Sequence, residues 1–501
     1  MTSLLWFRDD LRLTDHAALA AAAADPEGAV ALYVLDEMSP ETRPLGGAAK
    51  WWLHESLTAL SSALAELGIP LVLRRGAAEQ VVREVASARA IDRVLWNRRY
   101  GAERAIDARL KVRLRASGVT ATSYRGGLLF EPWAVRTGSG GHYRVYSPFW
   151  RACLGAPAPA EPLAAPGALT PRATRLASEL SVGLASDPLA DWCLQPTSPN
   201  WAAGLATRWV PGEAAALAQL ERFLATRARD YAANRDFPAL DTGSELSPYM
   251  RWGEISPRTV WHAALGAAAD HGVDVGVFLS ELGWREFAWH TAFHAGAAEA
   301  ARAADATDAT DAAGGANTAG STAPAVVLPG TALHERELNP QFDAFPWRAT
   351  TEAELAAWQR GETGFGLVDA GMRELRATGF MHNRVRMVAA SFLTKNLLAN
   401  WRVGEAWFWD TLVDADAASN PFNWQWVAGC GADAAPYFRV FNPETQQQKF
   451  DPEGAYVERF APHSVMLPQL VDLRETRVRA LAAYDTVRNA PRVRAAHEPD
   501  R

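Results

Sequence analysis

The segment 363–451 constrains the fold more than any other part of the chain, because tryptophans and polar residues recur in it at close spacing. It contains Met-His-Asn-Arg-Val-Arg-Met at 381–387, Asp-Ala-Asp-Ala-Ala-Ser-Asn at 414–420 and Asn-Trp-Gln-Trp at 423–426. A core needs few tryptophans, yet five of the chain's 20 lie here, at positions 401, 407, 409, 424 and 426. Large, oxidisable rings beside amides and charges indicate that this segment builds a site as well as a core.

The N-terminal segment 1–130 alternates short β-rich runs with Ala-, Leu- and Glu-rich stretches. This alternation predicts an α/β domain with a doubly wound parallel sheet over that segment. No Gly-x-Gly-x-x-Gly follows the first strand, so the usual dinucleotide-binding fingerprint is absent. The predicted strands are 3–7, 29–35, 70–74, 93–97 and 121–124, with helical stretches such as 51–67 and 78–86 between them.

The composition changes after position 130. Residues 131–211 are rich in Pro, Ala and Gly with weak periodicity, which predicts a long interdomain connection. Beyond that, strand signals vanish, and we expect one large all-helical domain over 212–490. The predicted helices include 213–231, 256–268, 278–290, 367–378, 384–401 and 404–413.

One stretch interrupts the helical pattern. Residues 297–325 are nearly all Ala, Thr, Asp and Gly, without an aromatic side chain. Such a segment buries too little apolar surface to offset the entropy of ordering it. We therefore expect a mobile, low-complexity surface insertion.

The formal net charge of −7 argues against a general polyanion binder. It leaves room for a local basic groove, because such a groove needs only a few clustered cations. Five cations close together in the sequence could supply one if they share a face, and otherwise each is a solvated surface residue: Arg373, Arg376, Arg384, Arg386 and Lys395.

The three cysteines, Cys153, Cys193 and Cys430, are far apart and give neither a disulfide framework nor metal-ligand spacing. The N-terminus lacks the pattern of a signal peptide, and no apolar run approaches the ~20 residues that cross a bilayer. We therefore expect a soluble, cytoplasmic protein without a bound metal.

Further motifs in fixed order accompany those of 381–426. They are Thr-Gly-Phe-Gly-Leu-Val-Asp-Ala-Gly-Met-Arg at 363–373, Gly-Phe preceding Met381, Phe-Asn-Pro at 441–443, and Trp-Phe-Arg-Asp-Asp-Leu-Arg-Leu-Thr-Asp-His at 6–16. With them the chain resembles the photolyase/cryptochrome family, most closely its bacterial cyclobutane pyrimidine dimer photolyases. The resemblance covers nearly everything except 297–325, and implies an α/β antenna domain followed by a helical flavin domain.

The resemblance implies FAD, folded into a U within the helical domain. Asp414 and Asp416 match a flavin-contacting pair, Arg386 matches an arginine paired with Asp414, and Asn420 matches the residue facing flavin N5. An amide there can donate or accept a hydrogen bond, so it tolerates a flavin whose charge changes. The other implied contacts are Tyr231, Arg285 and the phosphate-holding loop Gly243, Ser244, Glu245, Leu246 and Ser247, in which the family usually has Thr at position 243.

Residues 281–287, Glu-Leu-Gly-Trp-Arg-Glu-Phe, match the family's repair signature. Glu281 and Trp284 are spaced i, i+3 and so share one helical face. By resemblance Glu281 hydrogen-bonds the lesion and Trp284 stacks on it, since flat rings accept extruded bases. The remaining implied DNA contacts are Arg235, Asn383, Arg384, Met387 and Trp426.

Three tryptophans match the family's electron relay from the surface to the flavin. They are Trp424, Trp401 and Trp347, and the spacing between the first two agrees with the family. Core packing is the alternative role for each ring.

The resemblance also implies an antenna chromophore. Glu103 resembles the glutamate that binds methenyltetrahydrofolate, although Ala102 replaces the usual asparagine before it. Methenyltetrahydrofolate is the favoured antenna, and a deazaflavin is the alternative.

The function implied is blue-light repair of cyclobutane pyrimidine dimers in UV-damaged DNA by electron transfer from reduced FAD, in a monomeric enzyme. The first alternative is a cryptochrome-type photoreceptor; only the short segment 485–501 follows Tyr484, without the long extension that cryptochromes often carry. The second is (6-4) photoproduct repair, whose family branch has a second histidine where this chain has Asn383. A flavin-binding module without turnover is a third.

Overall fold

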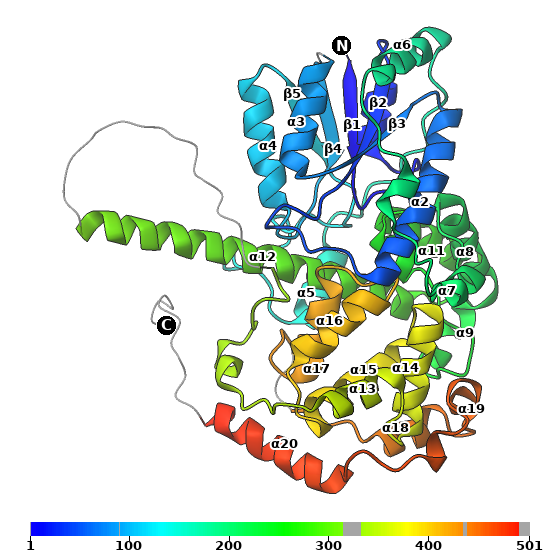
Figure 1. Ribbon diagram of the computed structural model, residues 1–501, viewed down its shortest axis with the longest axis vertical. Coiled ribbons are helices and arrows are strands. Elements are labelled where there is room, and N and C mark those ends of the chain that lie inside the picture. The colour runs from blue at the N-terminus through cyan, green and yellow to red at the C-terminus, as the bar shows by residue number, and fades with distance from the viewer. Residues whose placement is uncertain (1, 90, 314–331, 434–437, 490–501) are drawn as a thin grey trace.

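The computed structural model describes residues 2–89, 91–313, 332–433 and 438–489, and these form two parts (Figure 1). A parallel sheet flanked by helices forms the N-terminal part, and within the described residues every strand precedes position 125. The rest is helical. The predicted fold class is confirmed.

The sheet has five strands in the order β3-β2-β1-β4-β5, all parallel. Three strands begin and end as predicted, and the ends of β3 and β5 lie within one position of the prediction. The order changes direction at β1, and this is where parallel sheets place ligands, at the carboxyl ends of the strands. The strands are β1 Ser3–Phe7, β2 Ala29–Leu35, β3 Leu71–Arg75, β4 Arg93–Asn97 and β5 Thr120–Tyr124.

Both faces of the sheet are covered, and alternate residues of β1 show how. Leu4 and Trp6 pack with α3 (Ala78–Ala88) and α4 (Arg104–Ala116) in one apolar cluster. Leu5 and Phe7 point to the opposite face and join a larger cluster with α1 (Ala17–Ala23), α2 (Gly47–Glu66) and residues of the helical part. The larger cluster makes the two parts share a core.

The predicted connection 131–211 contains four short helical elements. Of these, α5 (Tyr146–Gly155) packs on the long helix α12, and α6 (Pro171–Val182) is capped by Thr170 and packs near β2. The other two are η1 (Leu189–Trp192) and α7 (Ala203–Arg208). The segment thus contributes packed helices to both parts.

The helical part consists mostly of short helices joined by loops that carry polar residues. Its first elements are α8 Glu213–Thr226, α9 Ala228–Asn234, α10 Ser247–Arg251, α11 Pro257–His271 and α12 Gly276–Ala313. The later ones are η2 Pro340–Ala344, α13 Glu352–Arg360, α14 Gly366–Thr378, α15 Asn383–Ser391, η3 Phe392–Asn396, α16 Trp401–Thr411, α17 Ser419–Ala428, α18 Pro443–Phe450, α19 Ala455–Phe460, η4 Ser464–Met466 and α20 Leu473–Arg488.

The single helix predicted over 384–401 is wrong. The chain forms α15, then the π-helical turn η3, and then leaves the helix before α16 starts at Trp401. Leu398 adopts a left-handed φ of 55°, and the Asn400 side chain caps α16 by accepting from the Arg402 N–H at 2.9 Å. A side-chain cap of this kind competes with helix continuation, and apolar periodicity does not reveal it.

The segment 297–325, which we expected to be a mobile surface insertion, is helical in its first part. Helix α12 continues without a break to Ala313 and projects from the body of the molecule (Figure 1). Alanine has the highest helix propensity, so an Ala-rich extension prolongs a helix that packing has already nucleated. Residues 314–325 lie outside the described part of the chain.

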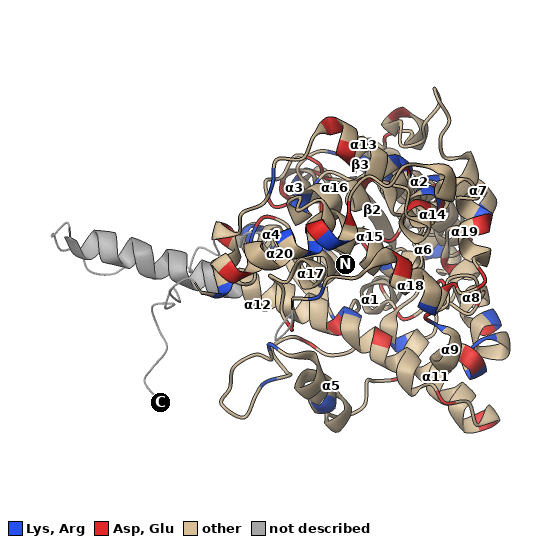
Figure 2. Ribbon diagram, turned by 90° about the horizontal axis from the view of Figure 1, so that it is seen from below, with Lys and Arg blue, Asp and Glu red and all other residues tan. Residues whose placement is uncertain are grey.

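Basic and acidic residues are interspersed along the ribbon in Figure 2. None of the described helices has the length and apolar character needed to cross a membrane.

Buried polar side chains join the two parts. The Arg12 guanidinium, 2% exposed, donates to the carbonyl oxygens of Gly253 and Gly126, each at 2.9 Å. Glu254, which is fully buried, accepts from Trp52 Nε1 on α2 at 3.2 Å and from the Gly212 N–H at 2.7 Å. These bonds fix how the helical part sits on the sheet domain.

Substituting Glu254→Gln isolates the pH dependence of this contact. Burial raises the pKa of Glu254 from 4.5 to about 8. Between these values the folded protein holds a proton that the unfolded chain releases, so this carboxyl's contribution to stability is lost as pH rises through that window. In thermal denaturation at a series of pH values, we expect the melting temperature of the unaltered protein to fall relative to the variant across the same window. The exposed Glu221→Gln change is the control, and a pH-independent difference for Glu254→Gln would contradict the assignment.

Candidate active site

A cavity of about 440 Å³ opens in the helical part, between α10, α12, α15 and α17. It brings together residues that lie far apart in the sequence, from Tyr231 to Trp426. Most of the residues singled out in the sequence line it: Tyr231, Arg235, Ser244, Leu246, Ser247, Glu281, Trp284, Arg285, Asn383, Arg384, Arg386, Met387, Asp414, Asp416, Asn420, Trp424 and Trp426. Gly243, Glu245, Trp401, Trp347 and Glu103 do not.

Asp414 lies in the loop between α16 and α17 and has charged and polar partners on two other elements. Arg386 on α15 donates to both carboxylate oxygens, at 3.0 and 2.9 Å, and also to the Met381 carbonyl oxygen at 2.7 Å. The Ser247 hydroxyl donates to the same carboxylate at 2.6 Å. Asp414 therefore ties α15 to the start of α10, and the pairing of Arg386 with Asp414 expected from the resemblance is present.

Asn420, near the start of α17, has a fixed orientation. Its amide nitrogen donates to the Glu405 backbone oxygen at 3.1 Å and to Glu405 Oε1 at 2.8 Å. Glu405 is 1% exposed and accepts two bonds from Arg43, at 2.7 and 2.9 Å. The amide oxygen of Asn420 has no bonding partner among the described residues, so the group presents an acceptor to the cavity. Sequence reasoning missed Glu405 and Arg43.

Side chains of neighbouring helices fix the conformation of the loop 241–247. Glu245 adopts a left-handed φ of 54°, and its carboxylate pairs with Arg208 on α7, which explains why it does not line the cavity. Gln219 donates to the Ser244 carbonyl oxygen at 2.7 Å, and Arg227 to that of Gly243 at 3.2 Å. A side chain at 243 would meet open space, so packing does not require glycine there. Arg208, Gln219 and Arg227 carry no local signature and were not anticipated.

Two arginines that line the cavity pair with carboxylates. Arg235 pairs with Glu281, and Arg384 pairs with Asp236 at 2.6 Å. The two arginine side chains are 19% and 20% exposed, so packing covers most of each stem while the charged heads meet their partners. Each pair therefore holds a charged arginine side chain in the cavity wall.

Trp284 on α12 is held by ring stacking. Its ring lies parallel to that of Tyr146 on α5, with centroids 3.7 Å apart and an interplanar angle of 11°. The Tyr146 hydroxyl donates to the Ser280 carbonyl oxygen at 2.7 Å, which fixes the stack to α12. Tyr146 therefore covers one face of the indole, and the other face is the one on which a ligand in the cavity can stack.

His382 precedes α15 and caps it, because its Nδ1 accepts from the Arg384 N–H at 3.2 Å. Burial lowers the pKa of His382 to about 4, so the ring is neutral at neutral pH and can accept this bond. The cap fixes the first turn of α15, from which Asn383, Arg384 and Met387 line the cavity.

The three tryptophans expected to form a relay belong to one apolar cluster. Trp424 lines the cavity and is 2% exposed, Trp401 is fully buried, and Trp347 packs against the same cluster with part of its ring exposed. Trp358 also contacts Trp424, edge to face with centroids 6.3 Å apart, and no motif pointed to it. The cluster therefore holds indoles from the cavity wall outward.

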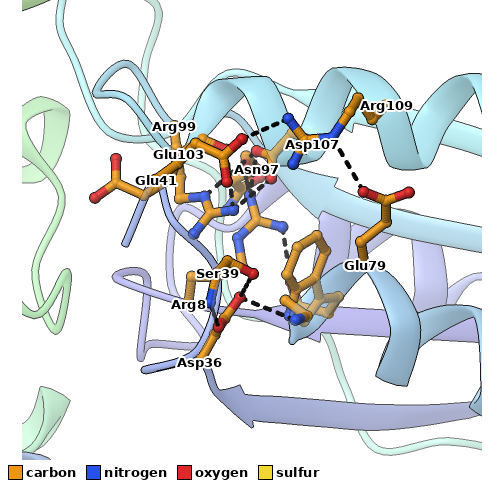
Figure 3. Close-up of polar contacts among 12 residues, drawn as sticks. Arg8, Asp36, Ser39, Glu41, Glu79, Asn97, Arg99, Glu103, Asp107 and Arg109 are labelled. Carbon is orange, nitrogen blue, oxygen red and sulfur yellow. Dashed lines mark hydrogen bonds and ion pairs between the residues drawn. The ribbon is translucent and has the colours of Figure 1, made fainter. Parts of the chain in front are cut away.

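A second cavity, of about 150 Å³, lies at the carboxyl ends of β1, β2 and β4. Figure 3 shows Arg8, Arg99 and Glu103 converging there. Glu103 lines it, and burial raises the pKa of its carboxyl, a shift that the nearby Arg99 opposes. Arg285 and Asp416 line both cavities, so the two are neighbours. Among the described residues no group of His, Cys, Asp or Glu side chains is arranged to hold a metal ion.

Comparison with known proteins identifies this arrangement. Residues 3–167 match the family model described as DNA photolyase, and residues 278–481 match the FAD binding domain of DNA photolyase. The deoxyribodipyrimidine photo-lyase of Agrobacterium fabrum is 42% identical, and the match covers 97% of this chain and 98% of that one. This chain belongs to the DNA photolyase family.

Two other photolyase-family members are informative. A bacterial class III photolyase from Agrobacterium tumefaciens superposes with a TM-score of 0.84 at 41% identity, covering 98% of both chains. Cryptochrome-1 of Arabidopsis thaliana is 33% identical over 93% of this chain and 63% of its own length. Repair enzymes and a cryptochrome therefore both resemble this chain.

The matched FAD-binding domain begins within α12 and extends into α20, and so includes the cavity walls formed by Glu281, Asp414 and Asn420. The residues present fit a flavin: a fixed amide acceptor, a shielded Asp–Arg pair and hydroxyls at the start of α10 face one cavity. The helical part of this photolyase-family protein is thus its FAD-binding domain.

Gly404→Ala tests how tightly Trp424 is packed. A Cβ at Gly404 on α16 would overlap the Trp424 ring and the Leu393 side chain. We expect overpacking to lower the free energy of unfolding by about 1–3 kcal/mol, measured by denaturant titration. The matched control is Gly266→Ala in α11, where a Cβ meets open space and should add about 0.5–1 kcal/mol. Equal effects of the two changes would show that the ring has room to move.

Proposed function

We propose that this protein is a deoxyribodipyrimidine photolyase that uses blue light to repair cyclobutane pyrimidine dimers in UV-damaged DNA. One observation carries the proposal. Glu281, Trp284, Asn383 and Trp426 share a 440 Å³ cavity with Asp414 and Asn420. Groups suited to two linked pyrimidine bases and groups suited to a flavin therefore face the same space.

The cavity residues would hold FAD as follows. Ser244, just before α10, offers its hydroxyl to the phosphates, and Asp414 keeps Ser247 and Arg386 in place. Asn420 offers its amide oxygen to an N–H of the flavin ring, because Glu405 already occupies its donor. Bound FAD, once reduced, would supply the electron that light transfers to the lesion.

The opposite wall would hold the lesion. Trp284, covered on one face by Tyr146, and Trp426, with Arg439 4.9 Å from its ring centroid, offer aromatic surfaces for stacking. Glu281 accepts hydrogen bonds from the extruded bases and stabilises the arrangement electrostatically, with Arg235 as its partner before DNA binds. Asn383, Arg384 and Met387 complete this wall.

A cryptochrome-type photoreceptor is the second candidate, favoured by the 33% identity to Arabidopsis cryptochrome-1. A photoreceptor would bind flavin and respond to light without repairing DNA. (6-4) repair is a weaker alternative, because Asn383 follows His382 in place of a second histidine.

Glu281→Ala tests the proposed repair role. Flavin-loaded, chemically reduced protein is illuminated with DNA that carries cyclobutane dimers, and restored thymine is measured. We expect the variant to repair with about tenfold lower yield at unchanged flavin content, because one electrostatic contact of about 1.4 kcal/mol is removed. Glu221→Ala, an exposed carboxylate, is the control. No repair by the unaltered protein, despite intact flavin, would favour the photoreceptor.

We also propose an antenna chromophore in the second cavity, with methenyltetrahydrofolate favoured over a deazaflavin. The support is its position at the switch point of the sheet and the convergence there of arginines with the half-buried Glu103 (Figure 3). Arg98, Arg99 and the ring of Tyr100 offer charge and stacking to a flat, anionic ligand.

Titration with methenyltetrahydrofolate tests this site. We expect saturable binding, followed by fluorescence, that Glu103→Ala weakens about tenfold and that Glu66→Ala, on the exposed end of α2, leaves unchanged. Equal affinity in all three proteins would show that Glu103 does not bind the chromophore. Saturation by a deazaflavin alone would show that the antenna is a deazaflavin.

A further inference from the structure

Trp401, the middle tryptophan of the relay that the resemblance implies, donates a hydrogen bond from its indole nitrogen to a carboxylate. Its Nε1–H group donates to the two oxygens of Glu337, with Nε1 2.9 and 3.0 Å from them. Glu337 is 6% exposed and Trp401 is fully buried, so little water separates or screens the pair. Arg402 donates to Glu337 Oε1 at 2.7 Å, and its own side chain is 35% exposed.

Trp358 provides a comparison within the same cluster. It is also fully buried and touches the Trp424 ring edge to face. Its Nε1–H donates to the Ala389 backbone oxygen at 3.1 Å, a neutral acceptor. The two buried indoles therefore differ in the charge of the group that accepts from the indole nitrogen. They also differ in that the Arg402 guanidinium carbon lies 4.6 Å from the centroid of the Trp401 ring.

This difference has a direct electrostatic consequence. Removing an electron from an indole leaves a positive charge on the ring and makes its N–H a stronger donor. A buried carboxylate on that N–H stabilises the oxidised ring more than a carbonyl oxygen does, because charge-assisted bonds are about twice as strong. Arg402 opposes this effect, because its guanidinium carbon lies 4.6 Å from the centroid of the Trp401 ring. The Arg402 side chain is 35% exposed and that of Glu337 is 2% exposed, so water screens the positive charge more than the negative one.

We propose that Glu337 is a positioning residue of the photoreduction relay, which makes Trp401 easier to oxidise and directs the positive charge from Trp424 to Trp401. This inference rests on the proposed relay. In the step, one electron passes from Trp401 to oxidised Trp424, which returns to its neutral form. Trp401 becomes a radical cation, no covalent bond breaks, and its proton stays in the hydrogen bond to Glu337.

The test is flash-induced transient absorption of the FAD-loaded protein, which records the yield and lifetime of tryptophan radicals. Glu337→Gln keeps an oxygen acceptor and removes the charge. We expect the population of long-lived tryptophan radicals to fall about tenfold, because the equilibrium between oxidised Trp424 and oxidised Trp401 shifts back towards the flavin side. Glu335→Gln, a neighbouring position with a carboxylate that is 54% exposed, is the matched control and should have no effect.

Arg402→Gln separates electrostatics from structural damage. It removes the positive charge opposite Glu337, so we expect a radical yield equal to or above that of the unaltered protein. An equal fall in both variants would overturn the proposal, because it would point to loss of packing. An unchanged yield in Glu337→Gln, or the absence of any tryptophan radical in the unaltered protein, would also overturn it.

A separate measurement keeps this result distinct from the proposed function. Chemically reduced Glu337→Gln protein bypasses the relay, so its dimer repair should match that of the unaltered protein. Normal repair with an unchanged radical yield would reject only the proposed role of Glu337 in the relay. Absence of repair in every protein would reject the photolyase proposal.

Discussion

The buried carboxylate of Glu405 is the interaction on which the orientation of the site depends. It accepts two bonds from Arg43 in the sheet domain and one from the Asn420 amide on α17. A buried ion pair of this kind contributes little net stability, since desolvation offsets the attraction, but removing one partner leaves an uncompensated charge. Its effect is therefore on geometry: it fixes the amide oxygen of Asn420 towards the cavity and holds the two domains in one relative position.

Other buried carboxylates act in the same way at the domain contact. Glu286 accepts from the N–H groups of Leu129 and Phe130 at 2.9 and 3.1 Å, and burial raises its pKa to about 7. Asp414 joins α15 to the start of α10. The aromatic rings supply the buried apolar surface, whereas these carboxylates determine which helix ends and loops meet around the cavity.

Local patterns predicted the regular elements well and failed where side chains override periodicity. The ends of all five strands were predicted to within one position. The clearest signals came from β1 and β2, since parallel strands buried on both faces read as continuous apolar runs. The helix expected over 384–401 was broken by the left-handed Leu398 and the Asn400 cap. The Ala-rich start of 297–325 is helical because alanine has a high helix propensity and prolongs a helix that is already nucleated.

The sequence by itself determined the alternation of the sheet domain, the helical character of the rest, and the order of motifs that indicates a flavin and a lesion site. The tertiary structure decided how those residues are presented. Arg43 and Glu405 are 362 positions apart, and Trp401 and Glu337 are 64 apart. Hydrogen bonds are directional and short, so which group of an amide or indole is engaged depends on partners that only folding brings together. No local pattern predicts that Asn420 faces the cavity with its amide oxygen, or that the Trp401 indole N–H donates to a carboxylate.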